Sequence, residues 1–170
     1  MKPLLVAPTF TKRPYVVAVD TREQLPYKLC GVNVVRKALS CGDYAIYGGD
    51  VLKVVAVERK SLPDLWMCLG SGRRRFERAL GRLSKVRWPA VLVEAPPSVL
   101  YDEYTYTYGG RGGKLQASAI GGKTARGSIF AWMRTYRVPF LFAGDRYHAE
   151  VYLVTWLDAM WRQLQREAKR

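Results

Sequence analysis

Short apolar runs of strand-like composition alternate along this chain with segments of helical periodicity. The strand-like runs include Tyr15–Val19 (YVVAV), Ala90–Val93 (AVLV) and Pro139–Ala143 (PFLFA). Between them, the segment RRRFERALGRLSKV places its apolar side chains on one helical face and its basic side chains on the other. Strands and helices in this order predict an α/β fold, with a mixed central sheet flanked by helices on both faces.

A predicted hairpin carries charge at the adjacent ends of its two arms. Gly42–Tyr47 and Val51–Val57 are strand-like runs, and the intervening GGD sequence is typical of a hairpin turn. Asp43 opens the first arm, and the triplet ERK that starts at Glu58 closes the second. Unpaired charge at the end of a buried strand is costly, so these groups require partners or a function.

The charged ends of the hairpin form a candidate metal site. Side chains alternate between the two faces of a strand, so Glu58 and Lys60 point to one face and Arg59 to the other. Asp43 lies beside Glu58, and paired carboxylates hold a hard cation such as Mg²⁺ or Mn²⁺, which activates water and screens phosphate charge. Lys60 would stabilise developing negative charge, with Asp20 as a further acid. An ordinary ion pair is the alternative interpretation of the Glu58 and Lys60 spacing.

The composition favours a polyanionic partner. The 170 residues contain 28 Lys and Arg against 14 Asp and Glu, a formal net charge of +14. Neutralising a phosphate releases condensed counterions, so nucleic acid is the expected partner, ahead of an anionic membrane surface or a merely solubilising role. No run approaches the ~18 apolar residues of a membrane span. Three cysteines without a CxxC pair and a single histidine argue against a structural zinc site or a disulfide framework.

The length fits one domain over residues 1–170. Residues 1–14 are expected to be an extension whose apolar patch is too short for a signal peptide, which predicts a cytoplasmic protein, or a nuclear one in a eukaryote. Residues 101–127, rich in Tyr and Gly, predict a long functional loop. The tyrosines of its YDEYTYTY segment fit either stacking on exposed bases or a simple β-hairpin.

Basic residues beside the proposed site and in the loop are candidate phosphate ligands. Ser61 is expected to cap a helix over LPDLWMCL, and the basic helix follows it. The sequence ASAIGGKT matches only a relaxed phosphate-loop pattern and no strand precedes it, which argues against nucleotide hydrolysis. The predicted DNA contacts are Arg73, Arg74, Arg75, Arg78, Lys114, Lys123 and Arg126.

Several motifs of this chain together resemble the nuclease domain of the XPF-type structure-specific endonucleases. The central motif is GD…ERKxxxD, with GD at 42–43, ERK at 58–60 and the last acid at Asp64. VDTRE resembles the first strand of that family, and RRRFERALGRL, AVLVEA and GSIFAWMRTYRVPFLFAGDRYHAE resemble the elements that follow its active site. The resemblance extends over residues 15–164.

The resemblance implies a restriction-endonuclease-like core, divalent-metal-dependent cleavage of branched or flapped DNA, and dimerisation. It carries over Asp43 and Glu58 as metal ligands and Asp20 as a supporting acid and further ligand. The implied catalytic residues are Asp20, Asp43, Glu58, Arg59, Lys60 and Asp64, with Arg59 bracing the site from the opposite face. The motifs come without a tandem helix-hairpin-helix module or a helicase domain, so we expect a stand-alone, single-domain member.

Two other functions remain open at this stage. A non-catalytic DNA-binding partner subunit of the same family typically lacks the acids that this chain retains. A restriction-type nuclease acting on plain duplex shares the chemistry and differs in substrate.

The C-terminal segment predicts self-association. The apolar residues of Val151–Leu164, including Trp156 and Trp161, cover more than the ~100° stripe that packing on one sheet requires. We therefore expect a homodimer with one of these tryptophans near the twofold axis, and a helix buried within a monomer is the alternative. His148, which has no partner motif, is expected at the surface or an interface.

Overall fold

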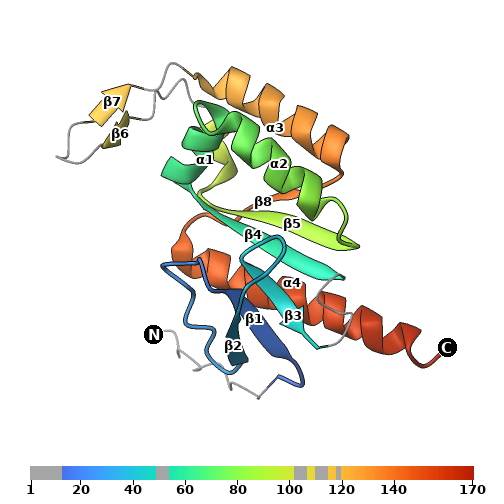
Figure 1. The fold of residues 1–170 in the computed structure, drawn as a ribbon. Helices are drawn as coiled ribbons and strands as arrows, with labels where there is room; N and C mark the ends of the chain where they lie inside the picture. Colours follow the sequence, from blue (N-terminus) through green and yellow to red (C-terminus); the bar gives the residue numbers. More distant parts are fainter. Residues whose placement is uncertain (1–12, 49–53, 102–106, 110–114, 118–119) are drawn as a thin grey trace, which may run out of the picture.

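A six-stranded mixed sheet forms the centre of the fold (Figure 1). The computed structural model describes residues 13–48, 54–101, 107–109, 115–117 and 120–170. The strand order is β2-β1-β3-β4-β5-β8; β3 is antiparallel to β1 and β4, and the other neighbours are parallel. The strands are β1 (Val16–Asp20), β2 (Asn33–Lys37), β3 (Tyr44–Tyr47), β4 (Val55–Ser61), β5 (Trp88–Glu94) and β8 (Phe140–Phe142). The predicted α/β fold with a mixed sheet is confirmed.

Helices cover both faces of the sheet, as predicted. Figure 1 shows α1, α2 and α3 on one side and α4 on the other. Alternate residues of β5 separate the two layers, because Val91 and Val93 pack with the first three helices, whereas Ala90 and Leu92 belong to the core of α4. The helices are α1 (Leu62–Leu69), α2 (Arg73–Leu83), α3 (Gly122–Tyr136) and α4 (Arg146–Glu167), with the 3-10 turn η2 at Pro97–Leu100. Within the described residues, no helix is long and apolar enough to span a bilayer.

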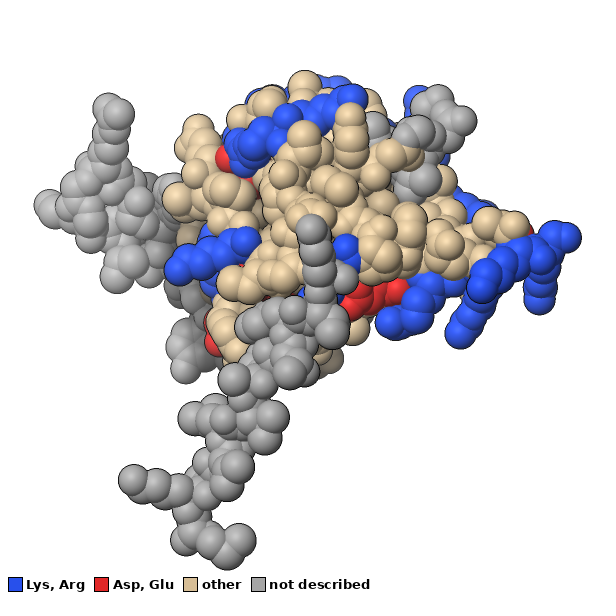
Figure 2. All heavy atoms as spheres, turned by 90° about the horizontal axis from the view of Figure 1, so that it is seen from below, with Lys and Arg blue, Asp and Glu red and all other residues tan. Residues whose placement is uncertain are grey.

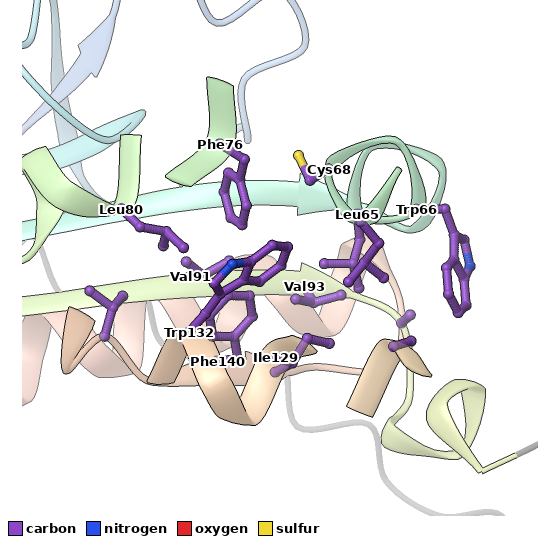
Figure 3. Packing of buried hydrophobic residues seen from close by; sticks show 14 of the residues in the cluster. Leu65, Trp66, Cys68, Phe76, Leu80, Val91, Val93, Ile129, Trp132 and Phe140 are labelled. Carbon is purple, nitrogen blue, oxygen red and sulfur yellow. The ribbon is translucent and has the colours of Figure 1, made fainter. Parts of the chain in front are cut away.

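Packing beneath α1, α2 and α3 fixes the position of α2. Phe76 and Leu80 are buried on the inner face of that amphipathic helix. The ring of Trp132 in α3 meets Phe76 edge-on, with centroids 5.2 Å apart, and stacks on Phe140 of β8 at 6.2 Å (Figure 3). Leu80→Ala would leave a cavity at a cost of about 2–5 kcal/mol. This layer holds the basic outer face of α2 in place.

Strands β3 and β4 form the predicted hairpin, but β4 extends further than predicted. Tyr44 pairs with Val57 near the start of β3. Strand β4 then continues to Ser61, because β5 runs parallel to it and places Glu94 opposite Ser61. The charged triplet at 58–60 therefore lies inside the strand, in the half that β3 does not cover.

Two segments differ from the sequence prediction. Strand β2, which pairs in parallel with β1 at the sheet edge, was not predicted. The range 101–127, predicted as a long loop with a β-hairpin as one alternative for its YDEYTYTY segment, contains the antiparallel pair β6 (Thr107–Gly109) and β7 (Leu115–Ala117) and the first turn of α3. Helix α3 begins within the predicted loop because its buried residues recur at helical spacing, at Ala125, Ile129 and Trp132.

Candidate active site

A pocket of about 220 Å³ opens over the uncovered half of β4. Its walls come from β1 and the residues just after it, the segment at 40–43, strand β4, and helices α1 and α2. The lining residues are Asp20, Arg22, Ser40, Cys41, Gly42, Asp43, Glu58, Lys60, Cys68, Arg75, Phe76, Ala79 and Arg82. Three of the predicted acids, the predicted lysine and three arginines thus share one pocket.

Asp43 is held against β4 by its backbone and by its carboxylate. Gly42, just before it, adopts a left-handed φ of 71°, and a Cβ there would lie 3.1 Å from the carbonyl oxygen of Val57. The amide of Asp43 donates to that carbonyl at 2.8 Å, and the amide of Arg59 donates to Oδ2 of Asp43 at 2.7 Å. Burial, together with the charge of Glu58, raises the pKa of the Asp43 carboxyl well above its usual value.

Glu58 and Lys60 lie on the same face of β4, as strand alternation predicts. The Nζ atom of Lys60 is 2.5 Å from Oε1 of Glu58, and their side chains are only 14% and 16% exposed. Lys60 also lies over the ring of Phe76, 5.3 Å from its centroid. Burial would lower the pKa of Lys60, but the charge and the hydrogen bond of Glu58 raise it overall, so the ammonium stays protonated.

Asp20 lies in the pocket, but four N–H groups already bind its carboxylate. Oδ1 accepts from the backbone N–H and Nε of Arg22, at 2.7 and 2.8 Å. Oδ2 accepts from the same guanidinium at 2.9 Å and from the amide of Leu39 at 2.7 Å. The hydrogen bond from the Arg22 side chain is the main reason that the pKa of Asp20 falls to about 2, against the effect of burial. Asp20 is therefore an ionised acid already engaged by Arg22.

Arg59 points to the opposite face of β4, as predicted. Its guanidinium binds both carboxylate oxygens of Glu94 at 2.7 Å and lies 3.4 Å from Oε1 of Glu23. The side chains of Arg59 and Glu94 are 10% and 8% exposed. Because the Arg59 amide also binds Asp43, this buried ion pair anchors the strand segment on which the site is built.

Asp64 lies apart from the other predicted acids. Ser61 caps α1 as predicted, accepting a hydrogen bond from the Asp64 amide, and its hydroxyl donates to Oδ2 of Asp64 at 2.6 Å. Asp64 is exposed and is not among the pocket-lining residues. Its observed contacts are those of a helix cap.

The predicted phosphate ligands fall into three groups. Arg75 lines the pocket, and Arg74 and Arg78 are exposed on the same helix. Arg73 is engaged within the fold, because it binds Glu77 at 2.9 Å and Ser128 at 3.0 Å. The other three are Lys123 and Arg126, which lie in α3, and Lys114, which is outside the described residues.

Several pocket residues were not singled out by the sequence. Arg22 was within the VDTRE motif, where its spacing of two from Asp20 was the available signal. Arg82 was assigned to the outer face of a basic helix without a role at the site. Cys41 and Cys68 carried no signal, because only the fold places them beside Glu58. His148 is exposed on α4 next to Asp145, in agreement with the predicted surface position.

The donor set suits a hard cation held by two carboxylates. Within the described part of the chain, no group of three or more His, Cys, Asp or Glu side chains is arranged to hold a metal. Asp43 and Glu58 nevertheless supply oxygen donors in one pocket, and Mg²⁺ commonly binds through one or two carboxylates while keeping several waters. Burial and the charge of Glu58 raise the pKa of Asp43, and a cation between the two carboxylates would offset the effect of that charge. The two acids therefore fit Mg²⁺ or Mn²⁺.

A comparison with protein families shows to which family the chain belongs. The model of the ERCC4 domain matches residues 19–155, from the end of β1 into α4. The chain belongs to the ERCC4 domain family. The nucleases of this family generally use divalent metals. No curated protein sequence matches this ERCC4 domain significantly.

Solved structures show the same fold. XPF from Aeropyrum pernix is 22% identical with a TM-score of 0.62, covering 91% of this chain and 69% of the archaeal chain. XPF from Aeropyrum pernix in complex with DNA is 24% identical with a TM-score of 0.58, covering 90% of this chain and 66% of that chain. The chain thus spans about two thirds of these archaeal chains. The predicted restriction-endonuclease-like core is confirmed.

Proposed function

We propose that this protein is a divalent-metal-dependent endonuclease that hydrolyses phosphodiester bonds in branched DNA. The observation that carries the proposal is the convergence of Asp43, Glu58 and Lys60 in one pocket lined by arginines. Carboxylates, an ammonium group and guanidinium groups are the combination that phosphodiester hydrolysis at a metal site requires.

Asp43 and Glu58 would hold the metal. When bound, Mg²⁺ or Mn²⁺ supplies Lewis acidity that makes water a better nucleophile and neutralises charge on the phosphate. The short contact between Lys60 and Glu58 keeps the ammonium close to the reacting phosphate, where it stabilises the added negative charge. Asp20 orients Arg22 toward the same pocket, and Arg22 and Arg75 bind the neighbouring phosphates.

We propose branched DNA, and not plain duplex, as the substrate because the family to which the chain belongs includes structure-specific enzymes. The complex of the archaeal XPF with DNA supports DNA as the ligand of that protein, and the net charge of +14 supports it for this one. The catalytic proposal is favoured over a non-catalytic partner subunit because both metal-binding acids and Lys60 are present and share the pocket.

The test is cleavage by the purified protein of labelled duplex, single strand, splayed fork, 3′ flap, 5′ flap and four-way junction, with Mg²⁺ and with chelator. We expect cuts near the branch that require the metal. Cleavage of every duplex alike would indicate the restriction-type alternative, and metal-dependent cleavage of none would indicate a DNA-binding subunit.

A homodimer through α4 is also proposed, at a different place on the helix from the one expected. Trp156 and Trp161 are partly buried against the core that α4 shares with the sheet, so the more exposed apolar residues of the helix are better candidates for the pairing surface. The exposed apolar residues of α4 are Tyr147, Val151 and Tyr152, at 74%, 49% and 48% exposure. The pairing surface is therefore assigned to these three residues.

Sedimentation at micromolar concentration tests the dimer. The wild-type protein should sediment as a dimer, and the combined change Val151→Glu and Tyr152→Glu should give a folded monomer of 19.3 kDa. Met67→Glu, at a 39% exposed apolar position of α1, is the control and should remain dimeric. A wild-type monomer would contradict this proposal.

A further inference from the structure

One face of helix α3 combines basic side chains with an exposed aromatic ring. Lys123, Gly127, Phe130, Arg134 and Arg137 follow one another at intervals of three or four residues, and all are exposed. Phe130 is 59% exposed, an unusual position for a large apolar side chain in the middle of a helix. Packing against the sheet does not explain this face, because α3 buries Ala125, Ile129 and Trp132 instead.

The charge on this face is uniformly positive. Helix α3 contains no Asp or Glu. In the part of the chain that the structure describes, Lys123, Arg134 and Arg137 form no ion pair, and Glu77, on the adjacent α2, is bound by Arg73 and by Nε1 of Trp132. Three unneutralised cations near an aromatic ring favour binding of a polyanion that carries planar rings able to stack.

Two residues on this face, Gly127 and Arg137, are of types that make the helix less stable than other residues would at the same positions. Gly127 lies in the helix interior, and no described heavy atom lies within 4 Å of where its Cβ would be, so Ala would fit and stabilise the helix. Arg137 ends the helix with a left-handed φ of 55°, which glycine adopts without strain. Helical side chains lean toward the N-terminus, so the missing side chain at Gly127 leaves the ring of Phe130 open to approach.

A second aromatic ring extends the face beyond the helix. Tyr101, which follows η2, is 70% exposed, and the guanidinium of Arg126 lies 5.1 Å from its ring centroid. Arg126 also donates to the carbonyl oxygen of Leu100, which fixes the side chain beneath the ring. Tyr101 is therefore held in place although it is exposed.

We propose that Tyr101, Lys123, Phe130, Arg134 and Arg137, here termed the α3 surface, bind an unpaired DNA strand. The two rings stack on bases, and the three cations bind the phosphates between them. Helix α3, which carries this surface, lies next to α2, since Arg73 of α2 donates to Ser128 of α3. This inference deepens the proposed function and rests on it for the choice of DNA as the ligand.

Fluorescence anisotropy with the full chain, in chelator so that no cleavage occurs, tests the proposal. The probes are labelled oligothymidine of about 16 nucleotides and a duplex of equal length. Phe130→Ala should weaken single-strand binding about tenfold, with duplex binding nearly unchanged, and Phe130→Trp should restore it. Tyr47→Ala is the matched control and should have no effect on binding. Tyr47 ends strand β3, away from α3, and it is a 41% exposed aromatic residue whose ring also lies beside a basic side chain, that of Lys37.

Unchanged single-strand binding by Phe130→Ala would overturn the inference, as would an equal loss on both probes. A change in the sedimentation of the DNA-free variant would also overturn it, because the surface would then bind protein. Cleavage assays on the same samples separate the two proposals. Wild-type protein that cuts no DNA but loses single-strand binding on Phe130→Ala would contradict only the proposed function. Metal-dependent cleavage with unchanged binding would contradict only the inference.

Discussion

The ammonium group of Lys60 lies 2.5 Å from the carboxylate of Glu58, two residues earlier on the same face of β4. Both side chains are largely buried, so solvent screens this ion pair only weakly. The strand places a cation next to a proposed metal ligand without any contribution from a loop. Lys60 is therefore positioned to act on a phosphate bound at the proposed site.

Lys60→Met should slow the chemical step by about 10²–10³-fold, because it removes a charge that stabilises the transition state while keeping the side-chain length. DNA affinity should change little. Single-turnover cleavage at saturating protein measures the step, and Lys37→Met, which removes an exposed lysine beside Tyr47, is the control. An unchanged single-turnover rate would remove Lys60 from the mechanism.

Glu94→Gln should lower the free energy of unfolding by about 3 kcal/mol, because it leaves the guanidinium of Arg59 buried without its main partner. Glu167→Gln is the matched control. Glu167 also binds an arginine, Arg87, through two contacts of 2.7 Å, but that pair is exposed and its loss should not shift the denaturation midpoint measurably. Urea denaturation of both variants makes the comparison, and equal effects would contradict the assigned role of burial.

The contribution of Glu94 should depend on pH. Burial opposes ionisation, but the hydrogen bonds and charge of Arg59 lower the pKa of Glu94 below its ordinary value of 4.5. A carboxylate with a lowered folded pKa contributes stability that is complete above the unfolded pKa and is lost as the pH falls through the folded pKa. The stability difference between wild type and Glu94→Gln should be constant from neutral pH to about pH 5 and shrink below that. A difference that grew on acidification would contradict the sign.

Charge reversal at Arg74 and Arg75 should weaken DNA binding and reduce the slope of log affinity against log salt by about two, because fewer counterions are released. The control reverses Arg162 and Arg166, two exposed residues of α4 that change the net charge equally. Figure 2 shows that basic side chains also gather at the end of α4, where the chain ends. If both double variants lost affinity equally, binding would depend on overall charge and not on α2.

The part of the fold that local pattern determines was predicted from sequence. The hairpin, the Ser61 cap and the inner face of α2 follow from turn residues, capping chemistry and periodicity, which act over a few residues. Strand β2 was missed because most of its residues are exposed and its partner β1 lies across a long connection. No alternating apolar pattern exists in such an edge strand, and only pairing defines it.

The sequence predicted that Asp20, Asp43, Glu58 and Lys60 lie together, as they do in the pocket, but it did not predict their supporting contacts. Strand alternation correctly placed Glu58 and Lys60 on one face and Arg59 on the other. The pairing of Arg59 with Glu94 joins residues 35 positions apart, so it depends on the parallel register of β4 and β5, which the sequence does not specify. The engagement of Asp20 by Arg22 likewise depends on the turn that follows β1.

The central claim is that Asp43 and Glu58 hold the metal that DNA cleavage requires. The most direct measurement is the Mg²⁺-dependent cleavage rate of a splayed fork by Asp43→Asn and by Glu58→Gln, with Glu167→Gln as an exposed control. We predict that each pocket variant stays folded and loses more than about 10³-fold in rate, while the control cleaves like wild type. Cleavage by folded Glu58→Gln at the wild-type rate, or full wild-type activity in excess chelator, would contradict the account.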